Sequence, residues 1–265
     1  MKKIYIMNKK IFPFFAAMML MQVVVFSQTA DFYGVVSLGG NVAVGDFGKA
    51  SVDGLQLQKW GLADDSPYGG AGIGANASVF GAKRVRGIEE LSIFVSADFF
   101  FSALNKTLRD YKEQYEVENL NARDKYEHSF PVYLDIPLLA GCRYDFFTNK
   151  RELFFFGQVG IGADLHIISD YTQYWNMYKH SSEAYSYKEE YRKKISFAAT
   201  AGAGVVLFEH IQVGIHYHYL GAFRVISTSE EKIDTPSGSS QTNNRAYSRG
   251  LLSPHLISLR VGYYF

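Results

Sequence analysis

The sequence predicts an all-β fold: an eight-stranded antiparallel up-and-down transmembrane β-barrel with four long external loops and short periplasmic turns. Three observations support this prediction: an amino-terminal export signal, eight segments of alternating apolar and polar residues, and a regular succession of long and short connections. Aromatic residues make up 16% of the chain and 24 residues are Gly, whereas only 6 are Pro. This composition favours strands and tight turns.

The beginning of the chain is typical of a secretory signal peptide. Four lysines among the first ten residues precede an apolar run at 11–26, and the small residue Ser27 follows it. The run is shorter than the roughly 20 apolar residues that a transmembrane helix needs. We therefore expect cleavage after Ser27, which divides the chain into a signal peptide, 1–27, and one barrel domain, 28–265. Losing four lysines changes the formal charge from +1 to −3.

Charge and cysteine content limit the function classes further. No block of like charge stands out, so we expect no nucleic-acid partner. The single cysteine, Cys142, cannot form an internal disulfide, and the exported fold must be held without one. After the signal, no apolar run is long enough for a membrane helix.

Eight segments show the period of two that places successive side chains on opposite faces of a strand. In the clearest of them, 88–102, alternate positions from Leu91 to Phe101 carry Leu, Ile, Val, Ala, Phe and Phe. The positions between them include Glu90 and Asp98. The eight segments fall near 31–46, 70–82, 88–102, 130–146, 152–166, 195–208, 211–221 and 255–265.

The connections between these segments alternate in length along the whole chain. The long ones lie near 47–69, 103–129, 167–194 and 222–254, and the short ones near Lys83–Gly87, Phe147–Arg151 and Glu209–His210. Outer-membrane barrels have this asymmetry, because tight turns face the periplasm and long loops face outside. Both ends of the barrel domain then lie on the side of the short turns.

A closed barrel also solves the backbone problem that a bilayer imposes. In hydrocarbon every N–H and C=O needs an internal partner, which only helices and closed barrels provide. Strands of about 9–11 tilted residues cross a bilayer, and all eight segments reach that length. We expect interfacial girdles to be formed by aromatic residues near the strand ends: Phe32, Tyr33, Phe99, Phe101, Tyr144, Phe146, Tyr217, Tyr219, Tyr263 and Phe265.

Two motifs carry a resemblance to a known family. The chain ends in Leu259-Arg260-Val261-Gly262-Tyr263-Tyr264-Phe265, which resembles the terminal signature by which outer-membrane barrels are handed to their insertion machinery, with Tyr263 and Phe265 as the signal. The stretch Val132–Tyr144 contains Asp135, then Ile-Pro-Leu-Leu, then Arg143 and Tyr144. It is similar to the fourth strand of the PorT-like, or porin-family, outer-membrane barrel domains of Gram-negative bacteria. The resemblance implies the fold but no single function, because members of the family differ; one of them acts in a protein-secretion system.

The alternation also predicts which ionisable residues face the lumen. An eight-stranded barrel is only wide enough for side chains to fill it, and its lumen is polar. We therefore expect these residues to pair with one another and to have a structural role: Glu90, Asp98, Asp135, Arg143, Asp164, His166, His216, His218 and Arg260.

Catalytic, cofactor and metal sites have weaker support, and we expect none of the three. His216 and His218 share a face and could bind zinc or nickel with a third ligand such as Asp135, but no ligand has diagnostic spacing. There is no Gly-x-Ser-x-Gly motif, and Cys142 occupies a lipid-facing position. An enzyme at the outer rim would need a Ser/His/Asp set, for which the sequence offers no strong candidate.

The long loops are where specificity is expected to lie. Loop 167–194 is rich in aromatic residues, and two alternatives stay open: recognition of a protein or glycan, or strands that extend beyond the membrane with aromatics packed on each other. Loop 103–129 has apolar residues at helical spacing, which indicates a short surface helix. Loop 222–254 is polar and is expected to be mobile. The candidate recognition residues are Tyr171, Tyr174, Trp175 and Tyr178.

These observations predict a non-enzymatic barrel of the bacterial outer membrane with a structural or interaction role, such as an accessory of secretion or envelope maintenance. The alternatives are a channel for small solutes and, with less support, a rim-located enzyme. We expect a monomer that contacts outer-membrane lipid and the insertion machinery, with a protein or glycan partner at the external loops.

Overall fold

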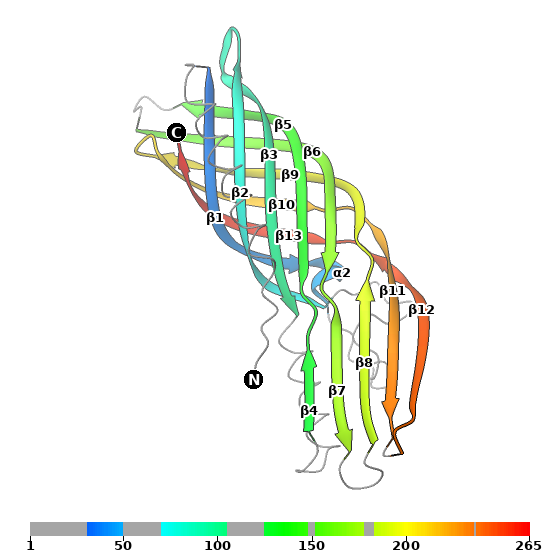
Figure 1. Cartoon of the computed structure of the whole chain (residues 1–265). Helices are drawn as coiled ribbons and strands as arrows, with labels where there is room; N and C mark the ends of the chain where they lie inside the picture. The colour runs from blue at the N-terminus through cyan, green and yellow to red at the C-terminus, as the bar shows by residue number, and fades with distance from the viewer. Residues whose placement is uncertain (1–30, 50–69, 105–124, 148–151, 178–182, 236) are drawn as a thin grey trace.

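The computed structural model describes residues 31–49, 70–104, 125–147, 152–177, 183–235 and 237–265. Eight long antiparallel strands close into a barrel in the order β1-β13-β10-β9-β6-β5-β3-β2 (Figure 1). The fold class predicted from the sequence is confirmed. The barrel strands are β1 (Phe32–Val44), β2 (Ala71–Val85), β3 (Ile88–Leu104), β5 (Tyr133–Phe147), β6 (Leu153–Ile168), β9 (Lys194–Leu207), β10 (Ile211–Tyr219) and β13 (His255–Tyr264).

The barrel is closed by the pairing of its first and last strands. β1 and β13 pair continuously from Val35 opposite Tyr264 to Val44 opposite His255. Beyond this register, Gly34 and Phe265 exchange two backbone hydrogen bonds of 2.9 and 3.0 Å. The barrel wall therefore has no free edge at the residue that ends the chain, which satisfies the requirement for a backbone in lipid.

Short turns gather at one end of the barrel, which we call the turn end. Gly87 in the β2–β3 turn has φ +88°, in the left-handed region that Gly adopts without strain. In the β9–β10 turn, Phe208 and Glu209 both have positive φ, as the central residues of a type I′ turn do, and the His210 N–H donates to the Leu207 carbonyl at 3.1 Å. The start of β1 and the end of β13 lie at this end too, as expected. The opposite end of the barrel is called the sheet end below.

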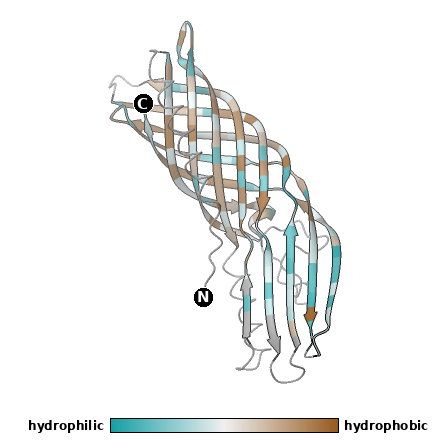
Figure 2. Ribbon diagram, viewed as in Figure 1, coloured by the Kyte–Doolittle hydropathy of each residue, from teal (hydrophilic) through white to brown (hydrophobic). Residues whose placement is uncertain are grey.

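The barrel is apolar outside and polar inside, the reverse of a soluble protein. In β3, Ile93 and Val95 are each 59% exposed, whereas Ser92 and Asp98 are at most 2% exposed. The same alternation runs around the wall, and Figure 2 shows the apolar colour over the barrel. An apolar surface on a closed sheet is the arrangement of a transmembrane β-barrel. The large apolar side chains that are more than half exposed on the barrel strands include Leu38, Ile73, Leu138, Val159, Ile161, Ile195, Phe197, Ile215, Leu259 and Val261.

Beyond the sheet end stands a second, five-stranded sheet with the order β12-β11-β8-β7-β4 (Figure 1). This order repeats that of five adjacent barrel strands, β13-β10-β9-β6-β5, so each strand continues the wall below it. We call it the external sheet. Figure 2 shows it as predominantly polar, in contrast to the barrel. Its strands are β4 (Lys125–Ser129), β7 (Tyr171–Met177), β8 (Glu183–Tyr191), β11 (Phe223–Asp234) and β12 (Ser240–Leu252).

The outcome differs among the three long connections for which a structure was predicted. The prediction that 222–254 is mobile was wrong, because β11 and β12 pair over most of this segment. Loop 167–194 contains β7 and β8, so its strands do extend beyond the barrel. The surface helix predicted within 103–129 falls mostly on 105–124, which lie outside the described residues, and 125–129 form β4. The predicted signal peptide, 1–27, also lies outside them.

Apolar side chains fill both ends of the lumen. At the sheet end, the four-residue helix α2 (Gly45–Gly48) turns the fully buried Phe47 inward, with its ring 5.1 Å from that of Tyr133. At the turn end, Phe80 and Phe94 stack at 4.8 Å. Tyr33 belongs to this inner group, with 5% of its side chain exposed, so its assignment to an interfacial girdle was wrong. Among the described residues, no helix is long and apolar enough to cross a bilayer.

Candidate functional site

The middle of the lumen is crossed by an ion pair between two strands that are far apart in sequence. Arg260 Nη1 on β13 donates to Asp98 Oδ1 on β3 at 3.0 Å, and both side chains are buried. Arg260 Nη2 also lies 3.2 Å from His218 Nε2, which lies 3.1 Å from the Ser258 hydroxyl. The guanidinium can only donate, so His218 Nε2 accepts from it. This group ties the wall together across the lumen.

A second buried group lies nearer the turn end. Arg143 Nε donates to Asp145 Oδ1 at 2.7 Å, and Nη1 donates to Gln212 Oε1 at 2.6 Å. The guanidinium carbon also lies 4.1 Å from the centre of the Phe156 ring, close enough for a cation–π contact. Since Arg143 is only 1% exposed, its charge is stabilised by these neighbours rather than by water.

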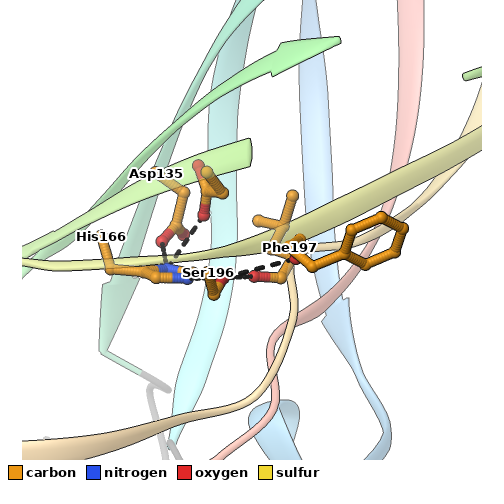
Figure 3. Close-up of polar contacts among 6 residues, drawn as sticks. Asp135, His166, Ser196 and Phe197 are labelled. Carbon is orange, nitrogen blue, oxygen red and sulfur yellow. Dashed lines mark hydrogen bonds and ion pairs between the residues drawn. The ribbon is translucent and has the colours of Figure 1, made fainter. Parts of the chain in front are cut away.

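A third group lies at the sheet end, where the barrel meets the external sheet (Figure 3). His166 Nδ1 lies 2.7 Å from Asp135 Oδ1 and 2.9 Å from Asp164 Oδ2. On the other side of the ring, His166 Nε2 lies 2.7 Å from the Ser196 hydroxyl, which also contacts the carbonyl oxygen of Leu220. Asp135 and His166 are opposite each other in the β5–β6 register, which explains how residues 31 positions apart meet.

The structure therefore places the predicted lumen residues in three separate groups. Asp98, His218 and Arg260 share the first, Arg143 lies in the second, and Asp135, Asp164 and His166 share the third. His216 is 2% exposed and lies beside His218. Glu90 is only partly buried and belongs to none of these groups in the part of the chain that is described.

Sequence reasoning missed several partners of these residues. Asp145 follows Arg143 by two positions, so period two places it on the same inward face and could have predicted it. Gln212 and Ser196 also lie on inward positions, of β10 and β9. No local signal connects them to their partners, because Arg143 and Gln212 are on strands that are not neighbours.

The metal site considered at His216 and His218 does not form. Their ring centres are 6.0 Å apart, but His218 is bonded to the Arg260 guanidinium, whose positive charge opposes a cation there. Asp135, the suggested third ligand, lies instead with Asp164 and His166. Among the described residues, these last three are the group of His, Cys, Asp and Glu with ligand atoms within 4.8 Å of one another.

Asp135, His166 and Ser196 have the order of a nucleophilic triad, but the direction of their hydrogen bonds opposes that chemistry. A general base must accept the serine proton. Here the Leu220 carbonyl can only accept, so the Ser196 hydroxyl donates its proton to that carbonyl. The serine oxygen then accepts from His166 Nε2, which leaves the serine without activation.

The outward face of the external sheet carries a shallow groove of about 430 Å³. Lys188 on β8 crosses it and forms ion pairs with Glu190 and, at 3.6 Å, with Asp170. Tyr174 on β7 lines the groove and is 36% exposed. Tyr171, in contrast, is 1% exposed and faces the other side of the sheet, with its ring 6.0 Å from that of Tyr187.

The four candidate recognition residues therefore have different positions. The assignment of Tyr171 to a recognition surface was wrong, because successive residues of a strand face opposite sides and Tyr171 packs inward. Tyr174 is on the exposed face, Trp175 belongs to β7, and Tyr178 lies outside the described residues. Packing of aromatics on each other, the second alternative for this loop, accounts for Tyr171.

The two edges of the external sheet differ. β4 is five residues long and contains Lys125. β12 is 13 residues long, contains neither Lys nor Pro, and is exposed at every position from Ser240 to Ala246. On one side it pairs with β11; in the described part of the chain no strand pairs with its other side. It thus presents a row of backbone donors and acceptors to solvent.

Among known proteins, no family model matches this chain, and no curated protein matches it. Solved structures match most of its length at low identity. The Neisserial surface protein NspA is 11% identical over 88% of this chain and 95% of its own, with TM-score 0.37. A major outer membrane protein from Thermus thermophilus is 12% identical over 88% and 99%, with TM-score 0.45. Ail, the attachment invasion locus protein of Yersinia pestis, crystallised with the heparin analogue sucrose octasulfate, is 11% identical over 89% and 99%, with TM-score 0.34. Identities this low transfer no function to this chain.

Proposed function

We propose that this protein is a non-enzymatic, monomeric barrel of the bacterial outer membrane whose external sheet binds a partner protein along the open edge of β12. The turn end faces the periplasm and the external sheet faces outside, because outer-membrane barrels place short turns inward and long connections outward. The observation that carries this proposal is the edge of β12, which is exposed from Ser240 to Ala246 and is not covered by another strand in the described part of the chain.

An open edge of this length is unusual because natural sheets protect their edges. Common protections are short strands, Pro, inward charges and Lys, and β4 has two of them. In β12 the segment from Ser240 to Arg245 is polar on both faces, so it is soluble and still able to accept another strand. An extended segment of a partner would gain main-chain hydrogen bonds by adding to this edge.

The proposal gives the barrel the role of a rigid anchor. Its three buried polar groups and the aromatic rings at both ends fill the lumen, which opposes a conduit for solutes. An accessory of secretion or of envelope maintenance would use such an anchor to hold a second protein at the surface. The resemblance of Val132–Tyr144 to PorT-like barrels supports this reading.

The test uses two proline variants of β12 in the intact protein. Successive N–H groups of an antiparallel strand point to alternate sides, so one of Asn243 and Asn244 donates toward β11 and the other toward the open edge. Of the variants Asn243→Pro and Asn244→Pro, one therefore loses a backbone hydrogen bond between β12 and β11, and the other loses only an N–H group that faces the open edge. Tyr174→Ala is the matched control on the groove face. A photo-crosslinking residue at Gln241 captures the partner in whole cells.

The expected result is a defined partner whose crosslink is lost in the proline variant that keeps the wild-type melting temperature, and retained in Tyr174→Ala. If only Tyr174→Ala lost the crosslink, the binding surface would be the groove and not the edge of β12. The ligand would then be one that fits the groove, such as a glycan, and not an added protein strand. Retention in both proline variants, or release of the protein with the soluble periplasmic fraction, would refute the proposal.

A further inference from the structure

In the group at the sheet end, hydrogen bonds alone do not compensate the negative charge of the two carboxylates. Asp135 and Asp164 are 3% and 0% exposed, and both direct a carboxylate oxygen at the same atom, His166 Nδ1. No described Lys or Arg forms an ion pair with either carboxylate. Two buried negative charges therefore converge on one ring nitrogen, which is costly unless a positive charge lies between them.

The hydrogen bonds on the far side of the ring determine what Nδ1 can offer. The Ser196 hydroxyl donates to the Leu220 carbonyl, so its oxygen accepts from the N–H at His166 Nε2. A neutral imidazole with its proton on Nε2 has a lone pair on Nδ1. In the metal-bound form this lone pair and the two carboxylates form a set of donors for a cation, whereas without a metal Nδ1–H donates to the carboxylate oxygens 2.7 and 2.9 Å away.

The carboxylates have further capacity that the protein does not use. Asp135 Oδ2 is buried and has no hydrogen-bond partner in the described part of the chain. The peptide groups of Ile136 and Leu165 approach the Asp164 carboxylate, but in the described part of the chain its oxygens have no close side-chain partner except His166 Nδ1, 2.9 Å from Oδ2. Buried polar atoms are nearly always satisfied, so buried carboxylate oxygens without a hydrogen bond, on residues whose ligand atoms lie within 4.8 Å of one another, point to a ligand.

We propose that Asp135, Asp164 and His166 bind a divalent first-row metal cation, with Zn²⁺ as the best match. One imidazole and two carboxylates suit Zn²⁺ or Mn²⁺ better than Cu⁺, which prefers sulfur ligands. The cation cancels the two negative charges. The chain of hydrogen bonds from Nε2 through Ser196 to the Leu220 carbonyl is the outer-shell support that metal-binding histidines have.

The place of this site in the fold gives the metal a structural role. Its ligands lie on β5 and β6, and Ser196 belongs to β9. The His166 ring also stacks on Phe223, the first residue of β11, with ring centres 4.0 Å apart. A bound cation therefore joins β5 to β6 and, through the stacked ring of His166, contacts β11 of the external sheet. Metal binding is expected to stabilise the junction on which the sheet stands.

The test is a titration of the full-length protein, purified in detergent and stripped with EDTA, with Zn²⁺ alone. We expect one equivalent to bind with a dissociation constant below the micromolar range and to raise the melting temperature. Asp164→Asn and His166→Gln should abolish both effects, and Ser196→Ala should weaken binding by about 10–100-fold. Asp170→Asn and His255→Gln, near the same end of the barrel, are the matched controls and should bind as the wild type does.

Three outcomes would overturn the proposal. One is the absence of stoichiometric Zn²⁺ or Mn²⁺ binding. Another is binding that Asp164→Asn and His166→Gln leave unchanged, or that His255→Gln abolishes, which would place the metal elsewhere. The last is an NMR spectrum in which His166 keeps protons on both ring nitrogens at saturating Zn²⁺, since a proton would then supply the positive charge. Where a ligand variant fails to fold, Co²⁺ absorption of the wild type, compared with Ser196→Ala, reports the same site.

Discussion

Replacing Arg143 by Met tests whether the lumen is held by compensated charge. The change removes the guanidinium but keeps most of the side-chain volume, and it leaves the carboxylate of Asp145, which is 0% exposed, without its partner. Removing one member of a buried ion pair costs about 3–5 kcal/mol, because the remaining charge stays buried and unpaired. The lost contact with the Phe156 ring adds about 1–2 kcal/mol at a desolvated site.

The assay is reversible unfolding by urea of the protein folded in lipid vesicles. We expect Arg143→Met to be destabilised by about 4–7 kcal/mol, and the double variant Arg143→Met/Asp145→Asn to recover part of that loss. Such recovery is a coupling of about 0.5–3 kcal/mol between residues in contact. Arg224→Met, at an exposed position of β11, is the control and should lie within about 0.5 kcal/mol of the wild type. A loss below about 1 kcal/mol for Arg143→Met, or additive effects of the two changes, would refute the reasoning.

Three further predictions follow from the same wall and lumen. In a planar bilayer the protein should carry no steady ion current, and sustained conductance would contradict a filled lumen. Cys142 faces outward on β5, so a spin label attached to it should be relaxed by a lipid-soluble paramagnetic reagent and not by a water-soluble one. A label at Ser240→Cys in a Cys142→Ala background should show the reverse. Gly141→Ala should lower the free energy of unfolding by about 1–3 kcal/mol in the same urea assay, because a Cβ there would lie 2.0 Å from a backbone oxygen and 2.8 Å from the Phe94 ring. Gly40→Ala should leave it unchanged, because the atom nearest to its Cβ would be 3.7 Å away.

The barrel could be predicted from the sequence because each of its strands lies between two different environments. Lipid on one face and a polar lumen on the other force the alternation seen at Ser92 and Ile93. The same rule predicts the inward position of Asp135, Arg143 and His166. Period two cannot predict which inward residues meet, because this depends on the register between strands and on the width of the lumen.

The sequence predicted extended strands only as one alternative for 167–194 and did not predict the rest of the external sheet, because its strands do not lie between lipid and a polar lumen. Its strands have water on at least one face and polar or aromatic residues on the other, so apolar and polar residues do not alternate along them. In β12 the residues from Ser240 to Ala246 are exposed on both faces, and the sequence there has the composition of a loop. A polar segment in water can pair its backbone either with another strand or with solvent, so composition alone does not decide between them.

At the boundary between the barrel and the external sheet, the closure of the wall and the polarity of its outward face change together. Below it, all eight strands form a closed wall with apolar side chains outward. Above it, five strands of the described residues continue, the outward face turns polar, and no other described strand pairs with the edge of β12. Both changes occur at the same level, near Ile168 of β6 and Lys194 of β9 (Figure 2). A soluble protein has no reason to lose closure and surface apolarity together. A bilayer requires both up to its surface and neither beyond it, so the coincidence marks where lipid ends.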